Sequence, residues 1–107
     1  MFREERMGKA VALTLTQDTI VGNDADLLHD AVERHMRHDS GRIVLDLSQV
    51  ISIDSRGLDA IVRLNRTPRG RRRLVLCGVG GALGLLLRVT RLDRVFTIRS
   101  SRDAALR

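Results

Sequence analysis

The stretch that decides the fold is residues 41–66, which read GRIVLDLSQVISIDSRGLDAIVRLNR. Its first part, residues 42–47, is apolar and β-branched, which is typical of a strand that is buried on both faces. Its last part, residues 58–65, places apolar side chains at helical spacing. The stretch therefore predicts a buried strand that leads through a polar turn into a helix.

The polar turn holds Asp54 and Ser55, and Gly57 follows two residues later. At the start of a helix the first backbone N–H groups lack partners, and an Asp or Ser oxygen commonly accepts a hydrogen bond from one of them. The helix dipole also favours negative charge there, including a phosphate. Two hypotheses follow: both side chains are only helix caps, or the serine is presented to a partner, with Gly57 leaving room for a second surface.

Towards the N-terminus, residues 9–17 alternate as in a half-buried strand, and residues 24–37 have the spacing of an amphipathic helix. We expect Asn23 or Asp24 to cap this helix and Gly41 to stop it. The apolar stripe of the helix consists of Leu27, Leu28, Ala31, Val32 and Met36. The pattern adds one strand and one helix before the deciding stretch.

Towards the C-terminus, Pro68 must lie at or beyond the end of the helix that follows the polar turn, because proline breaks a helix interior. Residues 73–79 and 94–99 are predicted strands, and a helix over 81–92 separates them. Residues 101–107 are expected to cap and form a short terminal helix. Strands and helices alternate throughout, which predicts a layered α/β domain.

Length and composition fit one such domain over residues 1–107, with its core at about 9–106. We expect a central mixed, largely parallel sheet of four to five strands with about four helices packed on it. No apolar run is long enough for a membrane span, and the N-terminus does not have the pattern of a signal peptide. The single cysteine, Cys77, fits a reducing cytoplasm.

Charge is spread unevenly. The first 53 residues hold six basic and nine acidic side chains, whereas the remainder holds thirteen basic and four acidic ones. This bias indicates either a phosphate-binding surface or only the codon usage of a GC-rich genome. Six arginines lie within residues 63–73, and they form a solvated helix end and loop, dock an acidic protein, or bind nucleic acid. Nucleic acid is the least favoured because no recognition motif accompanies the charge.

No residue pattern predicts a cofactor, a metal or catalysis. The glycine-rich residues 77–84 fail the dinucleotide fingerprint because Leu83 stands where its last glycine is required. His29, His35 and His38 are expected on a solvated helix face, without enough further ligands for a metal. No Ser-His-Asp order or carboxylate pair indicates an active site, so the chain is not expected to be an enzyme.

The deciding stretch resembles the STAS domain of bacterial anti-sigma-factor antagonists. In that family a strand ending in LDLS is followed by an apolar-Asp-Ser-x-Gly-Leu turn that starts a helix, as at residues 53–58 here. The similarity continues through residues 70–79 and 85–98. The resemblance implies phosphorylation at Ser55. It also implies a partner surface formed by Asn23, Asp24, Asp54, Ser55, Arg56, Gly57 and Leu58.

The resemblance implies a regulator that binds a serine kinase acting as an anti-sigma factor. The unmodified antagonist holds the kinase and frees a sigma factor, phosphorylation of Ser55 releases the kinase, and a phosphatase resets the serine. An alternative is a STAS scaffold without this switch, in a signalling complex or a lipid-transporting ABC system. Neither reading involves direct contact with nucleic acid or membrane, and the oligomeric state is left open.

Three features depart from the family pattern, and one of them is the strongly basic segment of residues 66–73. Arg56 stands where a small residue is common, and a guanidinium beside Ser55 would pair with a phosphate there. Val21 stands where the family has an acidic residue in the turn before the first helix.

Overall fold

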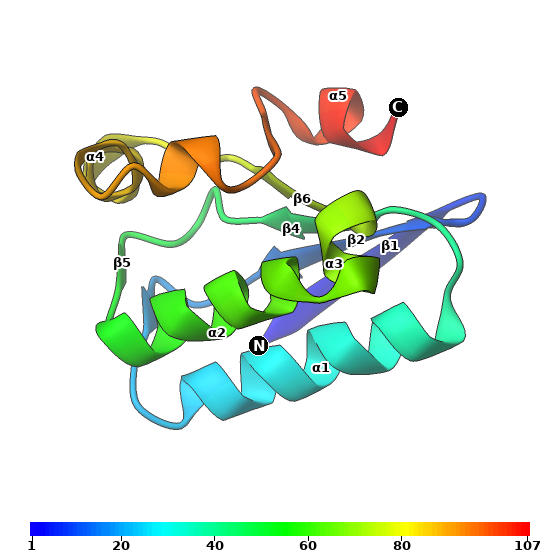
Figure 1. The fold of residues 1–107 in the computed structure, drawn as a ribbon, viewed down its shortest axis with the longest axis horizontal. Helices are drawn as coiled ribbons and strands as arrows, with labels where there is room; N and C mark the ends of the chain where they lie inside the picture. Colours follow the sequence, from blue (N-terminus) through cyan, green and yellow to red (C-terminus); the bar gives the residue numbers. More distant parts are fainter.

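The computed structural model describes residues 1–107 and places a five-stranded sheet at the centre (Figure 1). In order across this sheet the strands are β1 (Phe2–Met7), β2 (Ala10–Leu15), β4 (Ile43–Asp46), β6 (Leu74–Cys77) and β7 (Ile98–Arg99). Strand β1 is antiparallel to β2, and all other neighbours are parallel. A separate parallel pair joins β3 (Thr19–Ile20) to β5 (Ser52–Ile53). The predicted mixed, largely parallel sheet is confirmed.

Five α-helices and one 3-10 turn complete the fold. They are α1 (Asp24–His38), α2 (Ser55–Arg66), α3 (Pro68–Arg73), α4 (Gly81–Val89), the 3-10 turn η1 (Leu92–Arg94) and α5 (Arg102–Leu106). Helices α1 and α2 lie side by side on one face of the sheet, and α5 lies on the other (Figure 1). None of these helices has both the length and the hydropathy that a membrane crossing requires.

Alternate residues of the central strands divide the core in two. Val11, Leu13 and Leu15 of β2 belong to a cluster of 18 buried residues that includes the inner faces of α1 and α2. The second cluster consists of Ala12, Val44, Val75, Cys77 and Ala105. Strand β2 is therefore buried on both faces, and the expectation of a half-buried strand was wrong because α5 covers the second face.

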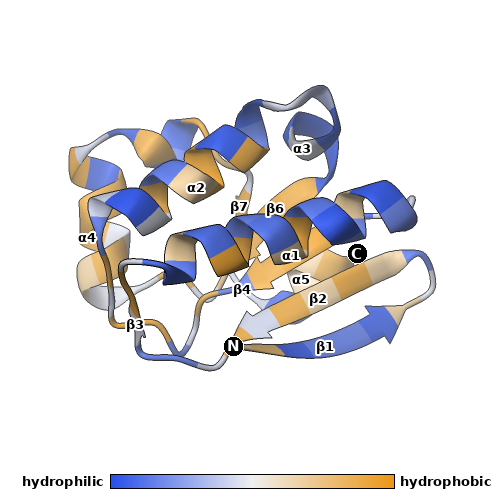
Figure 2. Cartoon of the chain, turned by 90° about the horizontal axis from the view of Figure 1, so that it is seen from below, coloured by the Kyte–Doolittle hydropathy of each residue, from blue (hydrophilic) through white to orange (hydrophobic).

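Strand β1 was missed because its sequence, FREERM, has no apolar alternation. Five of its six residues are exposed. It pairs with the whole of β2, from Phe2 opposite Leu15 to Met7 opposite Ala10. Figure 2 shows the contrast, with a hydrophilic β1 beside a hydrophobic β2. Backbone pairing with a buried neighbour, rather than side-chain burial, makes this segment a strand.

Near the C-terminus the elements are shorter than expected. The helix expected over 81–92 ends at Val89, and Arg91 follows with a left-handed backbone (φ 61°). The strand expected over 94–99 covers only Ile98–Arg99. The terminal helix is present, and the Ser101 hydroxyl accepts a hydrogen bond from the Ala104 N–H at 3.1 Å.

Helix α1 starts where expected, but its apolar stripe and its end differ from the expectation. Leu27 is 58% exposed, and Ala25 takes its place among the buried residues. Gly41 does not stop the helix, which ends at His38 with Asp39 as its C-cap. Instead, a Cβ atom at Gly41 would lie 2.1 Å from the Lys9 carbonyl oxygen, so glycine is required for the close approach of two loops.

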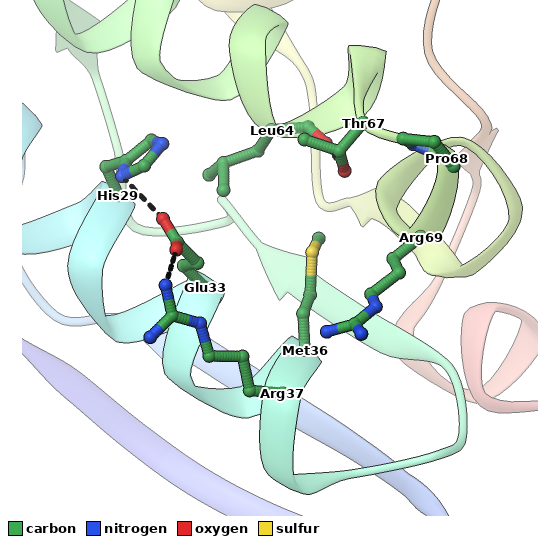
Figure 3. Close-up of a pocket in the computed structure, with 8 residues that line it drawn as sticks. All are labelled: His29, Glu33, Met36, Arg37, Leu64, Thr67, Pro68 and Arg69. Carbon is green, nitrogen blue, oxygen red and sulfur yellow. Dashed lines mark hydrogen bonds and ion pairs between the residues drawn. The ribbon is translucent and has the colours of Figure 1, made fainter.

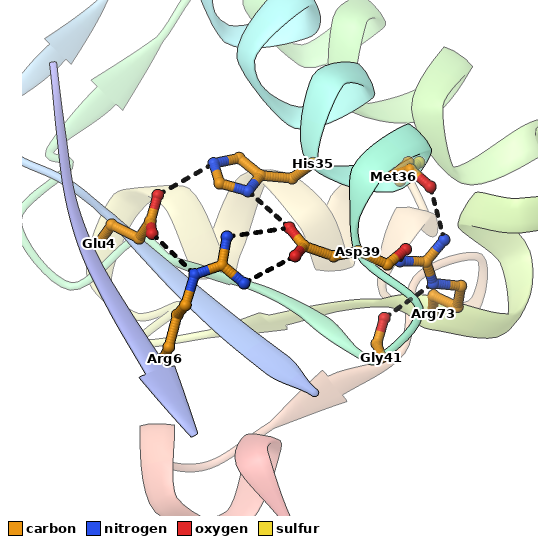
Figure 4. Close-up of polar contacts among 7 residues, drawn as sticks. All are labelled: Glu4, Arg6, His35, Met36, Asp39, Gly41 and Arg73. Atoms are coloured by element: carbon orange, nitrogen blue, oxygen red, sulfur yellow. Dashed lines mark hydrogen bonds and ion pairs between the residues drawn. The ribbon is translucent and has the colours of Figure 1, made fainter. Parts of the chain in front are cut away.

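The end of α1 is held by an arginine of α3 (Figure 4). The Arg73 guanidinium donates hydrogen bonds to the carbonyl oxygens of Met36, Asp39 and Gly41 at 2.8, 2.5 and 2.7 Å. These bonds satisfy carbonyls that a helix end leaves unpaired. The expectation that all arginines of residues 63–73 lie in a solvated helix end and loop was therefore wrong for Arg73, and residues 68–73 form a helix rather than a loop.

A second polar cluster at the same end ties α1 to β1 (Figure 4). Asp39 binds Arg6 at 2.6 Å and His35 at 2.9 Å, and these two side chains lower the pKa of the Asp39 carboxyl to about 2. The other ring nitrogen of His35 lies 3.2 Å from Glu4. The side chain of His35 is only 14% exposed, so its expected place on a solvated face was wrong.

Candidate functional site

The candidate site is built on the junction between β5 and α2. Asp54 takes the N-cap position, where its Oδ1 accepts a hydrogen bond from the Gly57 N–H at 2.8 Å. This bond satisfies one of the N–H groups that the first turn leaves without a partner. The cap expected from the sequence is therefore present, and Asp54 provides it.

The second oxygen of Asp54 reaches a different segment. Its Oδ2 accepts a hydrogen bond at 2.9 Å from the N–H of Gly22, whose backbone is left-handed (φ 59°). The Asp54 N–H donates in turn to the carbonyl of Ile20 at 3.0 Å. Hydrogen bonds from Gly22 and Gly57 lower the pKa of the Asp54 carboxyl. One carboxylate thus fixes the loop before α1 against the start of α2.

Ser55 is the first residue of α2, and it is exposed. Its hydroxyl makes no hydrogen bond within the chain, because Asp54 provides the cap. The first-turn position also brings it near the positive end of the helix dipole. The start of a helix favours a negatively charged group at this position.

Arg56 extends from the same turn towards α1. Its Nη2 lies 3.9 Å from the Asp26 carboxylate, and both side chains are more than half exposed. An exposed ion pair at this distance contributes little to stability. The Arg56 guanidinium is therefore loosely held and free to take another anionic partner.

Gly57 and Leu58 contribute to the interior as well as to the site. A Cβ atom at Gly57 would lie 2.7 Å from Cγ1 of Ile53 and 3.0 Å from Cγ2 of Ile20. Gly57 thus allows α2 to pack closely on the β3–β5 pair, and it is buried rather than open to a second surface. Leu58 is partly buried against the main core cluster.

Asn23 and Asp24 lie in the loop that Asp54 anchors. Asn23 occupies the N-cap of α1, but its side chain makes no capping hydrogen bond. Asp24 closes the turn instead, with its Oδ2 accepting from the Val21 N–H at 3.0 Å and from the Gln17 side chain at 3.2 Å. The structure therefore brings the two predicted parts of the partner surface, residues 23–24 and 54–58, to adjoining segments.

Three apolar side chains on or next to these segments are exposed, and one of them, Leu27, was expected in the core. Val21, Leu27 and Ile51 are 48%, 58% and 66% exposed. Leu27 was assigned to the core because its spacing fits the buried stripe, and only the packing of α1 shows that it faces outward. Exposed apolar side chains are common in protein-binding surfaces.

Nothing near the site has the character of a metal or cofactor centre. No group of three or more His, Cys, Asp and Glu side chains is placed to hold a metal ion. Cys77 is buried on the opposite sheet face, where burial raises the pKa of its thiol to about 11. The site consists of exposed surface, charged side chains and one hydroxyl without a partner in the chain.

The fold and this site together define a small α/β domain with an exposed polar surface at the start of α2. The chain matches the family model described as "Mlab, STAS domain" over residues 2–99. Because this match spans most of the sequence, the chain belongs to the STAS domain family. The family is non-enzymatic.

Solved structures of antagonists share the fold. A Thermotoga maritima protein described as a "putative anti-sigma factor antagonist" is 25% identical, with a TM-score of 0.84 over 97% of this chain and 90% of that chain. An antagonist of Mycobacterium paratuberculosis is 21% identical, with a TM-score of 0.86 over 99% and 90%. The Bacillus antagonist SpoIIAA in its unphosphorylated form is 13% identical, with a TM-score of 0.74 over 97% and 92%. No curated protein matches the sequence.

Proposed function

We propose that this protein is an anti-sigma-factor antagonist controlled by phosphorylation of Ser55. In its unmodified form it binds an anti-sigma factor that is also a serine kinase, and this relieves inhibition of a sigma factor in the cytoplasm. The observation that carries the proposal is the exposed, unbonded Ser55 hydroxyl beside the capping Asp54. The likeness to solved antagonists supports it, and SpoIIAA is also known in a phosphorylated form.

The modification is an ordinary phosphoryl transfer. The Ser55 oxygen attacks the γ-phosphorus of ATP bound by the partner kinase, the hydroxyl proton leaves to a base of the kinase, and ADP departs. The serine then carries about −1.5 to −2 charges at neutral pH. A phosphatase restores the hydroxyl by hydrolysis.

The domain accepts this charge without refolding. The phosphate sits at the positive end of α2 and is exposed, so it stays hydrated. Both oxygens of Asp54 remain engaged with Gly22 and Gly57, which keeps the two loops together. The loosely held Arg56 can pair with part of the new charge, while the remainder faces the partner.

Release follows from what the partner must cover. The proposed contact surface combines Asp54 and Ser55 with the exposed apolar side chains Val21, Leu27 and Ile51. A hydrated dianion in the middle of such a surface must lose its water on binding and finds Asp54 as a negative neighbour. A loss of about 3 kcal/mol weakens the complex roughly a hundredfold.

Replacement of Ser55 by Asp tests the switch. The protein with Ser55→Asp should remain folded but bind its kinase about a hundredfold more weakly, measured by titration calorimetry. Ser52→Asp is the matched control, because Ser52 is also exposed and lies three residues away. Equal affinity of the Ser55→Asp variant and the native protein would contradict the proposal.

Phosphorylation itself is tested by incubation with the kinase and ATP. Intact-mass measurement should show one phosphoryl group on the native protein and on a Ser52→Ala variant, and none on Ser55→Ala. A phosphoryl group on the Ser55→Ala variant would show that another residue is the acceptor.

The second candidate is a scaffold without a switch, in a lipid-transporting ABC system. The description of the matching family model, which names Mlab, favours it. In that case Ser55→Ala leaves function unchanged, and a transporter ATPase copurifies with the protein in place of a serine kinase. The identity of the copurified ATPase distinguishes the two functions.

A further inference from the structure

A groove of about 360 Å³ lies between α1 and the junction of α2 with α3, at the other end of α2 from Ser55 (Figure 3). Its lining consists of His29, Glu33, Met36, Arg37, Leu64, Thr67, Pro68 and Arg69. The volume falls within the range of small-molecule sites in proteins. None of the lining residues belongs to the surface around Ser55.

The groove exists because the chain turns away from α1 at the end of α2. Thr67 has an extended backbone (φ −65°, ψ 150°), and Pro68 then starts α3 in a new direction. The Thr67 hydroxyl donates to the Leu64 carbonyl at 2.8 Å and accepts from the Gly70 N–H at 2.9 Å. Glycine is required at position 70, where a Cβ atom would lie 1.8 Å from the Leu64 carbonyl oxygen. The turn is therefore fixed, and the space beside α1 is part of the fold.

The groove has an apolar floor and a charged rim. Met36 and Leu64 form the floor and are 4% and 1% exposed. On the rim, Glu33 uses one carboxylate oxygen to bind Arg37 and directs the other at His29 over 3.4 Å. Both oxygens of the one acidic side chain in the lining thus have partners (Figure 3).

Arg69 is different, because its guanidinium makes no ion pair and no side-chain hydrogen bond within the chain. Figure 3 shows it reaching over the floor towards Met36. With Arg37 neutralised by Glu33, the rim has one uncompensated positive charge, on Arg69. A guanidinium binds a carboxylate through two parallel N–H donors, and such bonds are among the stronger ones in proteins.

We propose that this groove binds a small organic monocarboxylate with an apolar body. The carboxylate pairs with Arg69, and the apolar body lies on Met36, Leu64 and Pro68. The single free charge matches a monoanion, and the buried floor matches a hydrocarbon chain or ring. The proposal does not depend on Ser55 or on any protein partner.

A ligand series tests the two halves of the site. The full-length protein is titrated with acetate, octanoate and neutral octanol, followed by backbone amide NMR. Octanoate should bind most tightly and shift the amides of the lining residues, because each buried methylene adds about 0.8 kcal/mol, or roughly fourfold. Acetate binding as tight as octanoate, octanol binding as tight as octanoate, or shifts outside the groove would each overturn the proposal.

A pair of variants tests the charge. Arg69→Gln should weaken octanoate about tenfold while leaving octanol unchanged. Arg72→Gln is the matched control, because Arg72 is exposed on the same helix but does not line the groove. An equal loss in both variants would show general attraction to a basic surface and would overturn the site. Ser55→Ala should leave octanoate binding unchanged, so this test fails or succeeds separately from the proposed switch.

Discussion

The two ends of α1 are held by carboxylates in contrasting ways. At the start, Asp54 accepts hydrogen bonds from two backbone N–H groups, those of Gly22 and Gly57. At the end, Asp39 binds the side chains of Arg6 and His35. The pKa of each carboxyl is lowered, but by hydrogen bonds from backbone N–H groups at Asp54 and by hydrogen bonds from the side chains of Arg6 and His35 at Asp39.

This contrast bears on where the protein can carry a switch. Backbone donors are fixed by the fold and remain after a side chain is modified, so the site near Ser55 can change charge without losing its shape. Hydrogen bonds from side-chain donors depend on the ionisation of the donor, on the salt concentration and on the flexibility of the side chain. The start of α1 is therefore the end that better suits a reversible change of charge.

The largest effect is expected from removing the arginine at the end of α1. Arg73→Ala leaves the carbonyls of Met36, Asp39 and Gly41 without their donor and should lower the free energy of unfolding by about 3 kcal/mol. Urea denaturation measures it. Arg72→Ala, on the exposed side of the same helix, should change stability by no more than ~0.5 kcal/mol. Equal effects would mean that the three bonds do not hold α1.

A smaller loss is expected at the start of α1. Gly22→Ala should cost about 1 kcal/mol, because an alanine is strained at φ 59°. No atom lies within 4 Å of the added methyl group, so the cost is conformational alone. Gly80→Ala is the control, since its backbone is extended and its Cβ would also meet open space. Thermal unfolding of the two variants measures the difference.

Acid should lower the free energy of unfolding by an amount comparable to, or smaller than, the effect of Gly22→Ala. The folded pKa of Asp39 is about 2 against a usual 3.8, so protons bind the unfolded chain more readily. This contribution to stability is present above about pH 4 and is lost as the pH falls towards 2. Because Arg6, the main partner of Asp39, is half exposed and its charge is screened by water, we expect at most about 1 kcal/mol. Asp39→Asn should remove this part of the pH dependence, and an unchanged acid profile would contradict its assignment to Asp39.

The smallest effect is expected from salt, which should change the pKa values of Asp39 and Asp54 by different amounts. At about 1 M salt the interaction of Asp39 with Arg6 is screened, and the pKa of Asp39 should rise towards its usual value. The pKa of Asp54 should move less, because backbone N–H groups are its main partners. Carboxyl carbon NMR titrations at low and high salt measure both groups in one sample. An equal rise would mean that charge, rather than backbone geometry, holds Asp54.

The sequence was informative where structure depends on neighbours in the chain. The strand within residues 42–47, the cap at Asp54 and the break at Pro68 are local patterns, and all three are present in the structure. The order of elements then fixed most of the parallel sheet. The exposure of Ser55 also agrees with the expectation that its hydroxyl is accessible, whereas its phosphorylation stays a prediction.

Features that depend on distant contacts were not predicted. Strand β1 has no apolar pattern, and only its pairing with β2 defines it. Arg73 is one arginine among six in residues 63–73, and nothing in the sequence shows that it alone faces the end of α1. Gly57 was expected to leave room for a second surface, because the sequence did not reveal that β3 and β5 pair and pack against it.

The edges of the sheet limit how another molecule can recognise this protein. A ligand that docks by strand addition requires a long, accessible row of unpaired backbone groups. One border is β1, whose outer residues Arg3–Arg6 are all charged, and the opposite border, β7, is only two residues long. Neither edge favours the addition of a strand from a peptide or from a second copy of the chain. Recognition by a partner is therefore expected through helices and loops rather than by strand addition to this sheet.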